Sequence, residues 1–210
     1  NTVLNSITAS HTRESFIQGH LPPECESCAL KEASVGHSRR KFFKDILNPM
    51  LENTNYSYTK TFNDIMFLEF NMSNICNLKC RMCNGISSSA WVKDELKLAK
   101  MNKDFQRPVD NPEFGYTNKS EQIIERLFED PTPFKNLRYL SIKGGEPYME
   151  PANKTILKKF IDLGVAKHVT LDWTTNGTIV DEEVHELAKQ YGHTKWTVSL
   201  EGTDNLYEYI

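Results

Sequence analysis

Three cysteines stand close together near the middle of the chain, in the order Cys76-Asn-Leu-Lys-Cys80-Arg-Met-Cys83. With this C-x3-C-x2-C spacing, one loop can hold three corners of an iron–sulfur cube and leave the fourth iron without a protein ligand. A structural metal site is normally closed by four protein ligands, so an open corner favours binding of a substrate or cosubstrate. The alternative is a zinc knuckle completed by histidine, but no histidine follows within thirty residues.

The remaining two cysteines, Cys25 and Cys28, form a second tight cluster, so all five fall into two groups. A disulfide framework would scatter the cysteines and favour an even number. Clustering at gaps of two and three residues indicates metal ligation in a reducing compartment. We therefore expect a cytosolic protein.

Composition narrows the class of protein. The chain has 210 residues, of which 39% are apolar and 25% charged, which is ordinary for a globular domain with an appendage. The net charge of −3 gives no basic field for nucleic acid. No apolar run approaches the roughly 18 residues that span a bilayer. We therefore expect neither a nucleic-acid nor a membrane partner.

Two regions differ along the chain. Residues 1–60 are polar and predict an N-terminal extension with one helix over about 32–51, ended or kinked at Asn48-Pro49, followed by a linker over 52–61. Residues 61–210 predict strands over 65–70, 137–142, 169–173 and 196–200, with helices over 87–101, 120–129, 151–163 and 181–191, the last capped by Asp181. This alternation is typical of an α/β fold with a parallel sheet and crossover helices.

Unusual residues follow each predicted strand. The first is followed by the cysteine loop, and the other three run into the turns Lys143-Gly-Gly-Glu-Pro147, Thr174-Thr-Asn-Gly-Thr178 and Ser199-Leu-Glu-Gly-Thr203. In such folds the chemistry lies at the carboxyl ends of the strands, so we expect these turns to share one rim. Asn176-Gly177 is equally a common turn dipeptide. We expect Glu69 either to line the interior of a barrel, together with Asn71, or to have a solvent-facing or salt-bridged role.

Over residues 63–210 these motifs resemble the radical S-adenosylmethionine (radical SAM) superfamily. The resemblance implies a partial (β/α)6 TIM-like barrel, of which this chain supplies the first four β/α units. We therefore expect a fragment, truncated after the fourth strand and at the N-terminus. Cys76, Cys80 and Cys83 would hold a [4Fe–4S] cluster whose fourth iron chelates S-adenosylmethionine. An electron donor of the flavodoxin or ferredoxin type would supply the electron that cleaves the sulfonium.

The reaction that the resemblance implies yields methionine and a 5′-deoxyadenosyl radical. That radical would abstract hydrogen from an unknown substrate, which could be a small molecule, a peptide or a protein. The protein would supply orientation and a dry pocket.

The resemblance also assigns roles to single residues. Met82 would pack near the adenine, and Gly144, Gly145 and Glu146 would receive the methionyl ammonium in a turn stiffened by Pro147. An ammonium offers three donors and needs carbonyls or a carboxylate, and glycines allow close backbone approach. The positions implied for the ribose, for S-adenosylmethionine more generally or for the substrate are Ser199, Glu201, Thr175 and Asn176. No basic contact to the methionyl carboxylate is identified.

The segment before Cys28 resembles the tail of the auxiliary-cluster module called SPASM, or twitch in its shorter form. In those proteins the module follows the barrel, whereas here the segment precedes it. Cys25 and Cys28 would then ligate part of a second iron–sulfur cluster, but a zinc half-site or unligated thiols fit the same spacing.

Two other functions compete with a radical SAM enzyme. One is a zinc-stabilised, non-catalytic binding module that uses both cysteine clusters. The other is an iron–sulfur electron carrier, which would have no use for an ammonium-binding Gly144–Pro147 turn.

Overall fold

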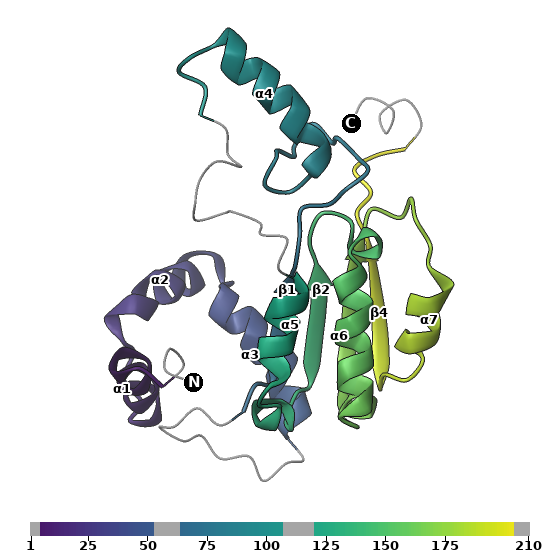
Figure 1. The fold of residues 1–210 in the computed structure, drawn as a ribbon. Coiled ribbons are helices and arrows are strands. Elements are labelled where there is room, and N and C mark those ends of the chain that lie inside the picture. The colour runs from purple at the N-terminus through teal and green to yellow at the C-terminus, as the bar shows by residue number, and fades with distance from the viewer. Residues whose placement is uncertain (1–4, 53–63, 107–119, 204–210) are drawn as a thin grey trace. The chain divides into compact units, whose positions relative to one another are not determined.

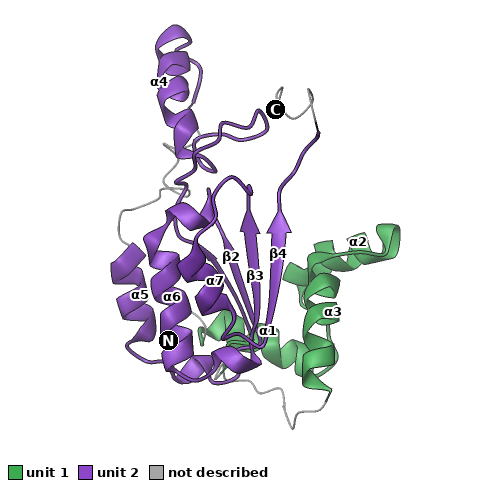
Figure 2. Cartoon of the chain, turned by 90° about the vertical axis from the view of Figure 1, so that its right-hand side faces the viewer, with its two compact units in different colours: residues 1–66 green, residues 67–210 purple. Residues whose placement is uncertain are grey.

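The structure is a computed structural model that describes residues 5–52, 64–106 and 120–203. The chain divides into two compact units, residues 1–66 and 67–210 (Figure 2). Among the described residues, no helix is both long and apolar enough to cross a membrane.

The first unit contains the helices α1 (Ile7–Ile17), α2 (Glu26–Val35) and α3 (Arg39–Leu51). The single helix predicted over 32–51 is wrong, because Gly36 ends α2 in the left-handed conformation at φ 70°. Ser38 then begins α3 by accepting a hydrogen bond from the Lys41 N–H at 3.0 Å. Pro49 does not end this helix, which continues to Leu51. Apart from Glu52, the predicted linker lies outside the described residues.

The second unit is an α/β fold with a four-stranded parallel sheet in the order β1-β2-β3-β4 (Figure 1). The strands are β1 (Phe67–Asn71), β2 (Tyr139–Lys143), β3 (Thr170–Thr175) and β4 (His193–Val198). The helices are α4 (Val92–Met101), α5 (Ser120–Phe128), α6 (Pro151–Asp162) and α7 (Glu182–Ala188). The predicted parallel sheet with crossover helices is therefore confirmed.

One face of the sheet is apolar and forms the core. Leu140, Ile142, Leu171 and Trp173 are fully buried on it. Helices α5, α6 and α7 lie over this face (Figure 2), and Phe160 of α6 is among the buried residues. Side chains alternate between the two faces of a strand, so the neighbours of these residues face the other way.

That opposite face is polar. The register aligns Glu69 of β1, Ser141 of β2 and Asp172 of β3. Glu69 pairs with Lys143 at 2.6 Å, and the Tyr139 hydroxyl donates to Asp172 at 2.9 Å. Glu69 therefore forms the salt bridge expected as one alternative, and it lies on the same face of β1 as Asn71. At the carboxyl ends of β1 and β2 this polar face ends with Asn71 and Lys143.

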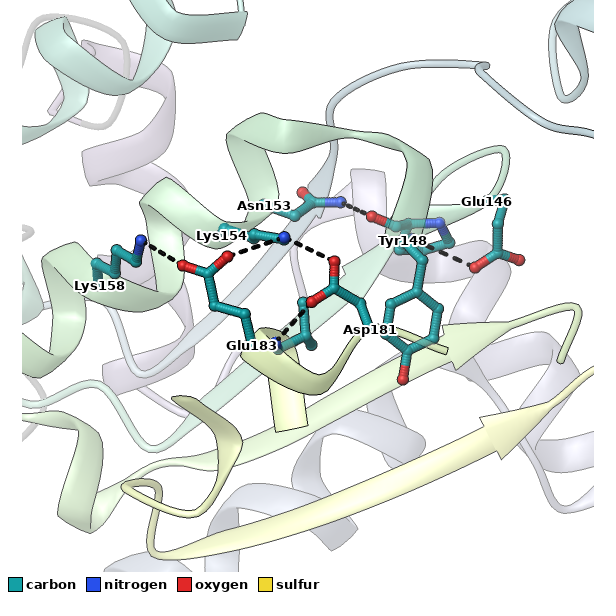
Figure 3. A network of polar contacts seen from close by, with 9 residues as sticks. Glu146, Tyr148, Asn153, Lys154, Lys158, Asp181 and Glu183 are labelled. Atoms are coloured by element: carbon teal, nitrogen blue, oxygen red, sulfur yellow. Dashed lines mark hydrogen bonds and ion pairs between the residues drawn. The ribbon is translucent and has the colours of Figure 1, made fainter. Parts of the chain in front are cut away.

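An ion-pair network joins α6 to α7 (Figure 3). Lys154 pairs with Asp181 at 2.6 Å and with Glu183 at 3.0 Å, and Lys158 pairs with Glu183 at 2.7 Å. Asp181 is the predicted N-cap, and its side chain accepts from the Val184 N–H at 3.2 Å. The hydrogen bond from Lys154 lowers the pKa of Asp181. These contacts fix the two helices that flank the strand-end turns.

Candidate functional site

The cysteine loop, residues 76–83, is held by the residues that follow it. The Ser88 hydroxyl donates to the Leu78 carbonyl at 2.5 Å, and the Trp91 indole donates to the Cys80 carbonyl at 3.0 Å. The Cys76 N–H donates to the Ser89 hydroxyl at 3.3 Å. These contacts satisfy backbone polar groups of the loop at Cys76, Leu78 and Cys80.

Gly85 closes the loop on its far side. Its N–H donates to Oε1 of the buried Glu95 at 2.6 Å, and its carbonyl accepts from the Asn74 side chain at 2.6 Å. A Cβ on Gly85 would lie 2.5 Å from the Glu95 carboxylate, so no larger residue fits without a shift. The two ends of the loop are thus joined across Gly85.

The three thiols of the loop line a single cavity of about 520 Å³. No three His, Cys, Asp or Glu side chains in the described parts of the chain gather closely enough to hold a single metal ion. An iron–sulfur cube does not need such convergence, because each thiolate binds a different iron. Burial, followed by nearby negative groups, raises the pKa of Cys80 and of Cys83. Binding of iron by these thiols would therefore release their protons.

The Gly144–Pro147 turn packs directly against the chain that leads into the cysteine loop. The Gly145 N–H donates to the Ser73 carbonyl at 3.0 Å, and the Glu146 N–H donates to the Ile75 carbonyl at 2.6 Å. A Cβ on Gly145 would lie only 2.3 Å from the Ile75 carbonyl oxygen. The absence of a side chain at Gly145 therefore allows the backbone at Ile75 to pack against this turn.

The Glu146 side chain is 1% exposed and faces the third strand end. Its Oε1 accepts from the Thr175 hydroxyl at 2.8 Å and from the Tyr148 N–H at 3.3 Å. Its Oε2 accepts from the Asn176 N–H at 2.7 Å. The carboxylate is therefore engaged by three donors of the fold itself.

Asn176 connects the third strand end to the cysteine loop. Its side-chain amide donates to Oδ1 of Asn77 at 3.0 Å and to Sγ of Cys76 at 3.7 Å. The Leu78 N–H also donates to the Cys76 sulfur, at 3.4 Å. Three segments that are distant in sequence are thus joined here: the Asn176 turn contacts Cys76, and the Glu146 turn contacts both Ile75 and the Asn176 backbone.

The cavity brings together most of the residues predicted for the site. Those that line it are Cys76, Cys80, Cys83, Gly144, Gly145, Thr175, Asn176, Ser199 and Glu201. Glu146 and Pro147 are buried behind it, and Met82 is 60% exposed and does not line it.

Six further residues line the cavity although they were not predicted as site residues: Leu78, Lys79, Ser87, Lys143, Thr174 and Asn71. Of these, Asn71 was predicted only as one of two alternatives. Three of them could have been found from strand periodicity. Asn71 and Lys143 end β1 and β2 in matching register, and Thr174 lies near the end of β3 on the same polar face. Lys143 also pairs with Glu69, which partly neutralises its charge.

The second pair of cysteines lies in the other unit. Cys25 is the N-cap residue of α2, and Cys28 lies in its first turn. Both thiols are free and partly exposed. Residues three apart on a helix share a face, so the two side chains can act together.

Comparison with known proteins identifies the family. The model of the radical SAM superfamily matches residues 70–210, which is more than half of the chain. The chain belongs to the radical SAM superfamily. Radical SAM proteins are generally enzymes that use a [4Fe–4S] cluster and S-adenosylmethionine, with an electron donor and a substrate. This match does not extend to the SPASM or twitch subtype.

Neither the curated proteins nor the solved structures include a match to this chain. The cavity offers three thiols and two glycines, and its volume falls within the range of about 300–1,000 Å³ that is usual for ligand pockets. The donor set and the space thus suit a cluster with a small-molecule cosubstrate.

Proposed function

We propose that Cys76, Cys80 and Cys83 hold the [4Fe–4S] cluster and that S-adenosylmethionine occupies the adjoining cavity, against Gly144 and Gly145. The observation that carries this proposal is that all five residues line one cavity. When bound, the cluster supplies the electron that cleaves S-adenosylmethionine to methionine and a 5′-deoxyadenosyl radical, which takes a hydrogen atom from the substrate.

The residues of the chain then have distinct tasks. Gly144 and Gly145 offer backbone to the methionyl group, while Glu146 holds the turn in place from behind, with Pro147 beside it. Ser199 and Glu201 line the cavity from the end of β4 and can bind ribose hydroxyls. Met82 lies outside the cavity, so we assign it no contact with the adenine.

We propose that the substrate lies against the polar face of the sheet. Asn71, Lys143 and Thr174 project from this face into the cavity wall. Their amide, ammonium and hydroxyl groups favour a substrate with polar groups, either a small molecule or a peptide. The four strands would be part of a six-stranded barrel that encloses it.

For residues 1–60, which lie within the first unit, we propose an extension to a radical SAM core of residues 61–210. Cys25 and Cys28 would supply two ligands to a second iron–sulfur cluster, with zinc as the alternative. The partner in electron transfer would be a protein of the flavodoxin or ferredoxin type.

The test is anaerobic reconstitution of the full chain with iron and sulfide. Cys83→Ser should lose the cluster, whereas the double variant Cys25→Ser/Cys28→Ser should keep about four irons per chain, as one [4Fe–4S] cluster requires. Zinc at stoichiometry, without iron or sulfide, would overturn the proposal. Retention of the full iron content by Cys83→Ser would also overturn it.

A further inference from the structure

The sulfur of Cys76 receives two hydrogen bonds of different origin. One comes from the backbone N–H of Leu78, two residues away, at 3.4 Å. The other comes from the side chain of Asn176, at 3.7 Å and 100 residues away in sequence. The second donor therefore exists only because β3 ends beside the cysteine loop.

The orientation of the Asn176 amide is fixed by its other contacts. Oδ1 accepts from the Thr178 N–H at 2.9 Å and from the Thr178 hydroxyl at 2.7 Å. With the oxygen held by two donors, the NH2 group must face the other way, toward Asn77 and Cys76. The backbone beneath the side chain is held by Glu146, which accepts the Asn176 N–H at 2.7 Å.

A hydrogen bond to a cluster sulfur has a defined electrostatic effect. Reduction adds negative charge, and an N–H donor stabilises the more negative form more strongly than the oxidised form. Hydrogen bonds to the sulfurs are among the features that set the reduction potentials of iron–sulfur clusters. Removing such a donor should make the cluster harder to reduce.

We propose that Asn176 raises the reduction potential of the cluster by donating a hydrogen bond to the sulfur of Cys76. This inference rests on the proposed assignment of Cys76 as a cluster ligand. Glu146 acts as a positioning residue in this arrangement, because it holds the backbone from which the Asn176 side chain extends.

The test compares reduction potentials of the reconstituted full chain, measured by dithionite titration and electron paramagnetic resonance without S-adenosylmethionine. Asn176→Asp keeps the oxygen that Thr178 requires but removes the donor to sulfur. Asn77→Asp is the control for charge: it adds the same charge next to Cys76 and keeps the Asn176 amide, while removing the Asn77 donor to the Thr178 hydroxyl at 2.8 Å. Asn176→Ala removes the donor without adding charge.

At a fixed potential we expect a ratio of reduced to oxidised cluster about tenfold lower in Asn176→Asp than in Asn77→Asp, which corresponds to about 59 mV for a one-electron couple. Asn176→Ala should also be harder to reduce than the wild type. Equal potentials in Asn176→Asp and Asn77→Asp would overturn the inference. So would loss of iron from both Asn176 variants, since Asn176 would then hold the loop rather than tune the cluster.

The result also separates this inference from the proposed function. Failure of the wild-type chain to assemble a [4Fe–4S] cluster would overturn both. A normal wild-type cluster whose potential is insensitive to Asn176 would overturn only the role of Asn176.

Discussion

The buried carboxylate of Glu146 accepts a hydrogen bond from the backbone N–H of Asn176, with Oε2 2.7 Å from the nitrogen. The N–H of Glu146 itself donates to the Ile75 carbonyl at 2.6 Å. One residue thus joins the second strand end to both the third strand end and the cysteine loop. The cavity is built by these contacts between turns, each of which follows a different strand.

Replacing Glu146 by glutamine should weaken this junction. Glutamine has only one acceptor oxygen in its side chain. Its NH2 group would therefore face at least one of the donors that now bind the carboxylate, and that hydrogen bond would be lost. We expect the free energy of unfolding to fall by about 1–3 kcal/mol, the usual cost of a broken buried hydrogen bond to a charged group. Chemical denaturation would measure it.

The matched control is Glu186→Gln, which changes a carboxylate whose side chain is 68% exposed and pairs with Lys189. Exposed pairs of this kind contribute at most about 1 kcal/mol. Equal losses in the two variants would contradict the role given to Glu146.

A methyl group at Gly145 should displace the cysteine loop. The added Cβ of Gly145→Ala would lie 2.3 Å from the Ile75 carbonyl oxygen, so one backbone segment must move. We expect a loss of stability of about 1–3 kcal/mol, typical of overpacking, together with lower iron content after reconstitution. Iron and sulfide analysis would check this.

Gly164→Ala serves as the control for that experiment. Its Cβ would meet no atom within 4 Å, but its φ of +71° is unfavourable for alanine. It should cost about 1–2 kcal/mol through backbone strain alone and leave the iron content unchanged. If Gly164→Ala lost as much iron as Gly145→Ala, the loss would reflect general destabilisation.

The ion pairs between α6 and α7 predict a pH dependence of stability. The hydrogen bond from Lys154 lowers the pKa of Asp181 from its usual 3.8, and hydrogen bonds from Lys158 and then Lys154 lower that of Glu183 from its usual 4.5. Carboxylates with lowered pKa stabilise the folded state above the usual values, and this contribution disappears as the pH falls through the lowered pKa. The wild type should therefore be more stable than Lys154→Met at neutral pH.

The difference between those two proteins should begin to shrink as the pH falls below about 4, and it should disappear once the pH has fallen through the lowered pKa values of both carboxylates. Denaturation at a series of pH values would measure it. A difference that stays constant down to about pH 3 would mean that Lys154 stabilises the helices by packing alone.

Much of the fold follows from local sequence patterns. The four strands and the strand-end turns are predictable because hydrophobic alternation and glycine-containing turns are local signals. The break at Gly36 was missed because a single glycine is tolerated within a helical pattern. Pro49 lies inside α3, and the helix ends two residues later at Leu51, which is also the predicted end.

The site was only partly predictable, for a different reason. The sequence places Glu146 in a turn suited to an ammonium, but its carboxylate is engaged by Thr175 and Asn176, about 30 residues away. Such partners depend on which turns meet in space. Lys143 is the opposite case: no motif assigns it a role, but the strand register brings it to the cavity.

The central claim is that the cluster held by Cys76, Cys80 and Cys83 binds S-adenosylmethionine in the adjoining cavity. The most direct test is the electron paramagnetic resonance spectrum of the reduced, reconstituted full chain before and after S-adenosylmethionine is added. The double variant Cys25→Ser/Cys28→Ser, which keeps only this cluster, should show a [4Fe–4S] signal that changes on addition. A [4Fe–4S] signal that stays the same at saturating S-adenosylmethionine would contradict the claim.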